Sequence, residues 1–125
     1  MARILLLEPN VQMGRIYAAG LQAGGHQVAV ATTAQDAICE ADEQRPDVVI
    51  LEIQLTKHSG IEFLYEFRSY ADWQQVPALV VSQVPPGEFK ASRDLLSRRL
   101  GVKAYHYKPQ TSLRTLLQAV DMVVG

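Results

Sequence analysis

Four side chains capable of chemistry stand at the ends of short apolar runs in this 125-residue chain. Glu8 and Glu52 each close an aliphatic run, Ser82 closes a third, and Lys108 closes a more mixed one. Two carboxylates, a hydroxyl and an amine around helix N-termini would form a pocket suited to handling phosphate. A single charged residue at a strand end is usually only solvated, so this prediction depends on the fold that positions all four.

The apolar runs predict the strands of one sheet. Continuous apolar runs over 3–8, 47–52 and 77–82 are typical of strands covered on both faces. The more mixed runs over 26–32 and 103–108 indicate strands at the sheet edges. Three central strands and two edge strands follow.

Helical patterns with capping residues separate these strands. Asn10, Thr33 and Ser112 or Thr111 precede helical patterns in positions suited to an N-cap. The last pattern carries an apolar stripe formed by Leu113, Leu116, Leu117, Val120, Val123 and Val124. We therefore expect a single α/β domain over 1–125, a flavodoxin-like (βα)5 three-layer sandwich with a parallel five-stranded sheet in the order 2-1-3-4-5. In that order Glu8 and Glu52 meet at the switch point, where ligands collect.

Composition excludes several classes of function. The net charge is −1 with no basic block, so no direct nucleic-acid partner is expected. The single cysteine, Cys39, predicts no disulfide framework and reads as a small buried residue on a helix. His26, His58 and His106 are too scattered to predict a metal site. No stretch has the length of a signal or membrane segment, so a cytoplasmic location without membrane attachment is expected.

Longer motifs give a specific resemblance. The stretches "ILLLEPN", "DVVILEIQLTKHSGIEFL", "VPALVVS" and "GVKAYHYKP" make the chain resemble a CheY-like response-regulator receiver domain from Ile4 to about Val123. The resemblance implies that Glu52 takes the place of the phosphoacceptor aspartate and that Lys108 is the phosphate-sensing lysine. It also implies a switch aromatic at Tyr105 and a cis peptide before Pro109.

The departures from the receiver pattern indicate lost chemistry. Glutamate moves the carboxylate roughly 1.5 Å further into the pocket than aspartate would, which disfavours in-line attack. Pro9 replaces an acid that the family uses for magnesium, so magnesium binding is expected to be weak or absent, with no other cofactor and no catalytic residue. Gln83 stands where receivers usually have a small residue, and its bulk is expected to narrow entry to the pocket.

These features favour a pseudo-receiver: a non-enzymatic signalling module that binds a protein, a second copy of itself included, without phosphorylation. Either the Glu52 charge mimics the phosphorylated state, or a Glu52–Lys108 ion pair holds an inert pocket shut; the sequence leaves both open. The alternative is a receiver with residual magnesium-dependent phosphotransfer in a two-component phosphorelay. A flavodoxin-type small-molecule binder is disfavoured because "EPNVQMG" is poor in Ser, Thr and Gly.

The expected partner surface combines the helix over 90–101, the strand over 103–108 and the last helix, which form the usual docking face of receivers. Four cations on the first of these elements would favour an acidic partner: Lys90, Arg93, Arg98 and Arg99. The aromatic-rich helix over 63–73 is expected to pack into the core through Phe63, Phe67 and Tyr70, and Trp73 is a second candidate for a partner surface.

Overall fold

Five parallel strands form one sheet in the order β2-β1-β3-β4-β5 in the computed structural model, which confirms the predicted topology. The structure describes residues 1–124, and for residues 89–91 only the backbone. The strands are β1 (Arg3–Leu7), β2 (Gln27–Ala31), β3 (Val48–Leu51), β4 (Ala78–Ser82) and β5 (Val102–Tyr107). Every residue of β3 and β4 is buried, as expected for central strands covered on both faces.

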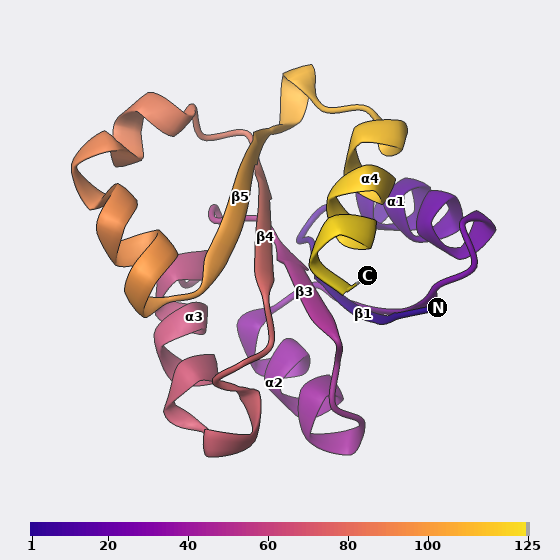
Figure 1. Cartoon of the computed structure of the whole chain (residues 1–125), viewed down its shortest axis with the longest axis horizontal. Coiled ribbons are helices and arrows are strands. Elements are labelled where there is room, and N and C mark those ends of the chain that lie inside the picture. Colours follow the sequence, from indigo (N-terminus) through magenta and orange to yellow (C-terminus); the bar gives the residue numbers. More distant parts are fainter. Residues whose placement is uncertain (125) are drawn as a thin grey trace.

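Helices cover both faces of this sheet (Figure 1). One layer holds α1 (Val11–Ala23) and α4 (Leu113–Val124), and the other holds α2 (Ala34–Glu43) and α3 (Gly60–Ser69). Each layer closes its own apolar core against the sheet, so the molecule is a three-layer sandwich.

The predicted capping residues start the helices. The side chains of Asn10, Thr33 and Ser112 accept hydrogen bonds from the backbone N–H three residues further on, at 3.0–3.1 Å. Ser59 does the same at the start of α3, where it accepts from the Glu62 N–H at 3.1 Å. These bonds satisfy donors that the first helical turn leaves free.

The fourth crossover is not the regular helix that was predicted over 90–101. A 3-10 helix, η2 (Pro86–Ser92), leads to a π-helical turn, η3 (Leu95–Arg99). The Leu100 N–H bonds the Leu95 carbonyl at 3.1 Å, five residues back, and the widened turn buries both Leu96 and Leu100. Burial of two leucines from a short connection therefore overrides regular helix geometry here.

The aromatic segment packs into the core on the α3 side. Phe63, Phe67 and Trp73 are buried and stack in sequence, with ring centroids 5.4 and 4.9 Å apart. Core packing is thereby confirmed for the two phenylalanines, whereas Tyr70 is 44% exposed. Trp73 is 5% exposed and hence unavailable as a partner surface.

Cys39 is exposed, so its predicted burial is wrong. The buried stripe of α2 consists of Ala37 and Ala41, and Cys39 lies midway between them on the opposite side of the helix. Its thiol lines a cavity between α2 and α3 together with His58 and Glu62.

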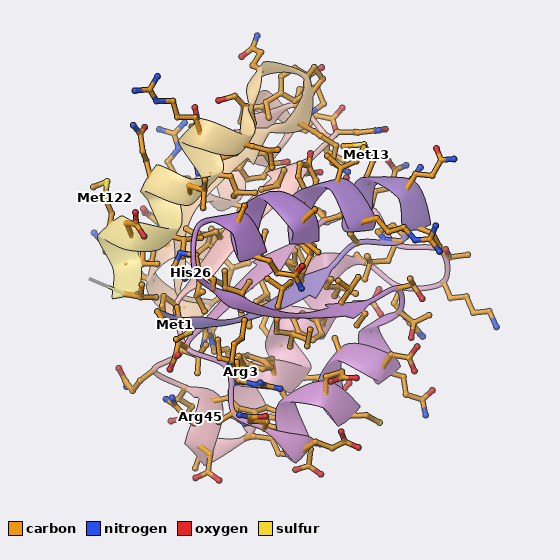
Figure 2. The ribbon with its side chains drawn as sticks, turned by 90° about the vertical axis from the view of Figure 1, so that its right-hand side faces the viewer. Met1, Arg3, Met13, His26, Arg45 and Met122 are labelled. Carbon is orange, nitrogen blue, oxygen red and sulfur yellow. The ribbon has the colours of Figure 1, made fainter. Side chains whose placement is uncertain are left out.

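His26, which directly precedes β2, contacts both Ala2 near the N-terminus and Asp121 on α4. The ring is buried, its Nδ1 accepts the Ala2 N–H at 3.1 Å, and its Nε2 lies 3.5 Å from Asp121 Oδ1. Figure 2 shows His26 between Met1 and the end of α4 that carries Met122. This histidine therefore has a structural role in holding the N-terminus against α4.

Gly60 allows the loop after β3 to close on itself. A Cβ on Gly60 would lie 2.7 Å from the Glu52 carbonyl oxygen and 2.8 Å from the Ile53 Cα, both backbone atoms. We expect Gly60→Ala to lower the free energy of unfolding by about 1–3 kcal/mol, because the loop must move to relieve the overlap. Urea denaturation measures this. Gly87→Ala, with nothing within 4 Å of the added Cβ, is the matched control, and equal stability of the two variants would contradict the expectation.

Candidate functional site

The fold brings Glu8, Glu52, Ser82 and Lys108 together at the carboxyl edge of the sheet. Glu8 and Glu52 directly follow the paired residues Leu7 and Leu51 of adjacent strands. The Glu52 N–H bonds the Leu7 carbonyl at 3.0 Å, which fixes the two acids side by side. Ser82 ends β4, and Lys108 follows β5.

Lys108 bridges the two carboxylates. Its Nζ lies 2.7 Å from Glu8 Oε1 and 2.9 Å from Glu52 Oε1. The three side chains are only 8, 3 and 4% exposed for Lys108, Glu8 and Glu52, respectively. Solvent therefore screens this triad weakly, and the ammonium is the counter-ion for both buried acids.

The Glu52 carboxylate is fully hydrogen-bonded. Oε1 accepts from Lys108 Nζ and from the Gln83 N–H, at 2.9 and 3.1 Å. Oε2 accepts from the Ser82 hydroxyl and, at 3.0 Å, from the Gln54 N–H. A carboxylate offers about four lone-pair positions, so the chain's own donors occupy all of them.

These contacts change the pKa of both charged partners. Burial raises the pKa of Glu52, but four hydrogen bonds outweigh it and bring the pKa below the ordinary value of 4.5; the donors are Gln54, Ser82, Lys108 and Gln83. Burial alone would lower the pKa of Lys108, but hydrogen bonds to the two carboxylates raise it above 10.5. Both groups are therefore charged at neutral pH.

A chain of hydrogen bonds connects the pocket to Tyr105. The Ser82 hydroxyl donates to Glu52 and accepts the Val84 N–H at 3.0 Å. The Val84 carbonyl in turn accepts the Tyr105 hydroxyl at 2.6 Å. Tyr105 is half-buried against the apolar core on the α3 side, and burial raises its pKa. A continuous chain of hydrogen bonds thus joins the Glu52 carboxylate to the Tyr105 hydroxyl on β5.

The peptide bond before Pro109 is trans, so the expected cis peptide is wrong; every peptide bond in residues 1–124 is trans. Residues Lys108–Gln110 form a single 3-10 turn, η4, closed by a 3.2 Å bond from the Thr111 N–H to the Lys108 carbonyl. A trans bond is the lower-energy form before proline, and this turn accommodates it while Lys108 reaches the pocket.

The chain's own side chains compete for the place of the magnesium ion that the receiver resemblance implies. One oxygen of each carboxylate already binds Lys108, and Pro9 has no side-chain oxygen to offer. Magnesium requires close to octahedral oxygen ligation, which this set does not supply. Among the described residues, no group of three or more His, Cys, Asp or Glu side chains could hold a metal ion.

Sequence reasoning missed the backbone donors of the site. The N–H groups of Gln54 and Gln83 complete the shell of Glu52, and the Asn10 N–H bonds Glu8 Oε2 at 3.0 Å. Gln83 is exposed and contributes its backbone N–H to the site, and the expectation that its bulk narrows entry to the pocket stays a prediction. No residue type signals these contacts, because every non-proline residue carries the same N–H.

The lowered pKa of Glu52 predicts how the free energy of unfolding changes at acid pH. Because the folded pKa is below 4.5, the charged carboxylate stabilises the fold above pH 4.5, and this contribution is lost as pH falls through the folded pKa. Glu52→Gln should therefore flatten the fall of unfolding free energy at acid pH. Urea denaturation at several pH values measures the slope. An acid limb of unchanged slope would contradict the assignment, and the exposed Glu66→Gln is the control.

Comparison with known proteins defines the class. Residues 4–121 match the family described as "Response regulator receiver domain", and the chain belongs to this family. Protein PilH of Pseudomonas aeruginosa is 26% identical over 125 residues, which cover 100% of this chain and 99% of that protein. The structure of the chemotaxis protein CheY4 of Vibrio cholerae matches with a TM-score of 0.86 at 22% identity, over 98% of each chain.

A longer relative is matched only in part. The KDP operon transcriptional regulatory protein KdpE of Escherichia coli is 28% identical over 120 residues, which cover 91% of this chain and 52% of that protein. The chain therefore spans about half the length of this relative. The described residues contain no helix with the length and apolar character needed to span a bilayer. The family match identifies a receiver-type signalling domain, and the fold agrees with it.

Proposed function

We propose that the chain is a phosphorylation-independent interaction module of the receiver type, with Glu52 in place of the phosphoacceptor aspartate. The observation that carries the proposal is the fully occupied Glu52 carboxylate, whose oxygens accept from Lys108, Ser82 and two backbone amides. A nucleophilic oxygen needs a free lone pair aimed at the phosphorus atom. In this pocket the chain's own donors compete for every such position.

The same contacts favour one of the two hypotheses for Glu52: its charge mimics a phosphoryl group, and the pocket is not merely inert. Its carboxylate reaches the Ser82 hydroxyl, the Gln83 amide and the Lys108 ammonium, three donors suited to phosphoryl oxygens. Through Ser82 and Val84, this charge is linked to an inward-packed Tyr105. We infer that Glu52 holds the domain in a permanently signalling conformation. The carboxylate carries one negative charge, whereas a phosphoryl group carries about 1.5 to 2, so the mimicry is partial.

The module acts through a protein partner and not as an enzyme. The partner surface of the proposal is formed by η2, η3, β5 and α4, next to Tyr105 and the exposed cations Arg93, Arg98 and Arg99. The side chain of Lys90, the fourth predicted cation, lies outside the part of the chain that the structure describes. A second copy of the chain is an alternative partner on the same face. A cytoplasmic location, without nucleic acid or membrane contact, completes the proposal.

Intact-mass measurement tests the central claim. The protein is incubated with magnesium and acetyl phosphate, and we expect no species heavier by one phosphoryl group. A receiver of the same family with an aspartate acceptor serves as the positive control. A stable phosphoryl adduct on the chain would overturn the proposal and favour residual phosphotransfer in a phosphorelay. Glu52→Gln then tests the built-in anion, since partner binding unchanged by this variant would leave only the inert pocket.

A further inference from the structure

A cavity of about 550 Å³ lies between α2 and α3, which are neighbours on one face of the sheet (Figure 1). The small side chain of Ala34 lines it on the α2 side and leaves room toward α3. The half-buried Ile38 and the buried Phe63 give it an apolar interior. Polar groups stand at its outer edge, with Gln35 and Cys39 both exposed. The two helices therefore enclose an apolar groove, the α2–α3 groove, that is open to solvent.

The edge of the α2–α3 groove is acidic. Glu62 and Glu66 lie one turn apart on α3, and both line the cavity and are exposed. No lysine or arginine side chain that the structure describes lines this cavity. The basic group in its lining is His58, whose Nδ1 lies 3.3 Å from Glu62 Oε2. Because even a protonated imidazole offsets only one of the two carboxylates, the groove keeps negative charge in either state of His58.

Among the described residues, cations lie at the two ends of the α2–α3 groove and not along it. Lys57 lines a smaller cavity beside the start of α2. Arg45 follows the end of α2, and the cavity that it lines there also contains Asp42 and Asp72. Arg68 of α3 donates to two backbone carbonyls outside the groove. A cationic partner therefore meets the least repulsion at the middle of the groove.

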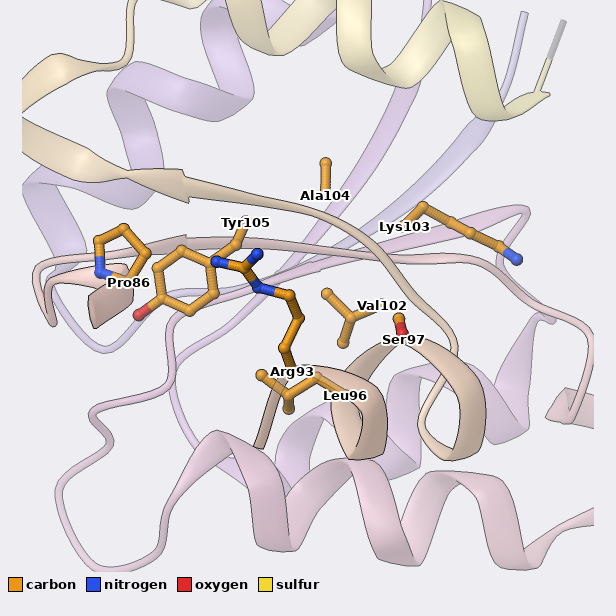
Figure 3. Close-up of a pocket in the computed structure, with 8 residues that line it drawn as sticks. All are labelled: Pro86, Arg93, Leu96, Ser97, Val102, Lys103, Ala104 and Tyr105. Carbon is orange, nitrogen blue, oxygen red and sulfur yellow. The ribbon is translucent and has the colours of Figure 1, made fainter. Parts of the chain in front are cut away.

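The α2–α3 groove is separate from the partner surface proposed above. Figure 3 shows side chains of that surface, Tyr105 and Arg93 among them, beside the η2–η3 segment. None of the residues that line the α2–α3 groove belongs to η2, η3, β5 or α4. An inference about this groove therefore goes beyond the proposed function.

We propose that the α2–α3 groove binds a basic amphipathic helix of a partner protein, with aliphatic side chains on Ile38 and lysine or arginine side chains on Glu62 and Glu66. Helices present side chains one turn apart at the same spacing as these two carboxylates, so a helix laid along α3 matches both. The aliphatic stems of lysine and arginine cover apolar surface while their charged ends reach the carboxylates. The walls need no ordering, because buried residues such as Ala37 and Phe67 already anchor both helices to the sheet.

Binding of designed helical peptides tests the proposal. Four fluorescein-labelled amphipathic peptides of equal length are titrated against the intact chain by fluorescence anisotropy: Lys with a Leu stripe, Gln with a Leu stripe, Glu with a Leu stripe, and Lys with an Ala stripe. We expect the Lys–Leu peptide to bind at least about tenfold more tightly than the other three, with affinity falling as salt rises. Equal binding of the Lys–Leu and Gln–Leu peptides, or of the Lys–Leu and Lys–Ala peptides, would overturn it.

Charge reversal locates the binding. Glu62→Lys with Glu66→Lys should weaken binding of the Lys–Leu peptide about tenfold or more. Glu43→Lys with Glu88→Lys is the matched control, because it changes the net charge equally at two exposed positions outside the groove and should leave binding nearly unchanged. Equal loss in the two double variants would mean attraction to net charge alone and overturn the site.

A single added cation keeps the test independent of the two glutamates. Gln35→Arg places a positive charge in the lining of the α2–α3 groove at an exposed position and removes neither carboxylate. It should weaken binding of the Lys–Leu peptide several-fold and leave binding of the Gln–Leu peptide unchanged. Circular dichroism confirms that each variant is folded. Undiminished binding of the Lys–Leu peptide by a folded Gln35→Arg chain would contradict the placement of the peptide in this groove.

Discussion

Lys108→Met should lower the free energy of unfolding at pH 7 by about 3–5 kcal/mol, the loss expected when one partner of a buried ion pair is removed. The ammonium is the only cation within 4.0 Å of Glu8 and Glu52 among the described side chains. Without it, two nearly buried carboxylates face each other across the pocket. Natural domains are stable by only about 5–15 kcal/mol, so the variant would be severely weakened. Urea denaturation measures the change.

Two comparisons separate the effect of uncompensated buried carboxylates on stability from the effect of removing any lysine. Lys103→Met removes an exposed ammonium that forms no ion pair with the side chains the structure describes, and it should change stability by no more than about 0.5 kcal/mol. Adding Glu52→Gln to Lys108→Met should recover part of the loss, because one uncompensated charge disappears. The deficit of Lys108→Met should also shrink at acid pH as the Glu52 carboxylate becomes protonated, because the variant lacks one of the donors that lower its pKa. If Lys108→Met and Lys103→Met were equally stable, the triad would not support the fold.

The convergence of the four site residues could be predicted because it depends on strand order alone. Apolar runs without polar interruption marked the central strands, and parallel strands place their carboxyl ends on one edge. Glu8, Glu52, Ser82 and Lys108 each occupy such an end, so the sheet itself brings them together. The sequence also marked the helix starts, because a capping side chain has a specific residue type.

The parts that could not be predicted depend on atoms that every residue shares or on packing from distant segments. The saturation of Glu52 depends on two backbone N–H groups, whose direction is set by the turns after β3 and β4. The π-helical turn results from the burial of Leu96 and Leu100 against a core formed by other elements. The trans bond before Pro109 likewise follows from a turn and not from a motif.

The strongest gain of function is expected from Glu52→Asp combined with Pro9→Asp. Aspartate withdraws the carboxylate by roughly 1.5 Å, so it cannot keep its contacts with Ser82, Gln54 and Gln83 together, and lone pairs become free. Aspartate at position 9 adds a carboxylate beside Glu8. The variant has two acids after β1, at positions 8 and 9, and a shorter acid after β3, at position 52. The pocket therefore gains oxygen ligands, and its negative charge exceeds the positive charge of Lys108.

We expect this double variant to bind magnesium at least about tenfold more tightly than the natural chain, since the added oxygens approach the ligation that the ion requires. Calorimetric titration with magnesium chloride measures this, and intact mass after acetyl phosphate treatment reports whether phosphorylation follows. Glu52→Asp with Pro9→Ala is the matched control, because it frees the same backbone without adding a carboxylate. If the variant and this control bound magnesium equally, Pro9 would not be the reason that the natural pocket disfavours the ion. Tight magnesium binding by the natural chain would contradict the claim that Lys108 occupies the pocket, because Lys108 would then have to leave the two carboxylates that it bridges.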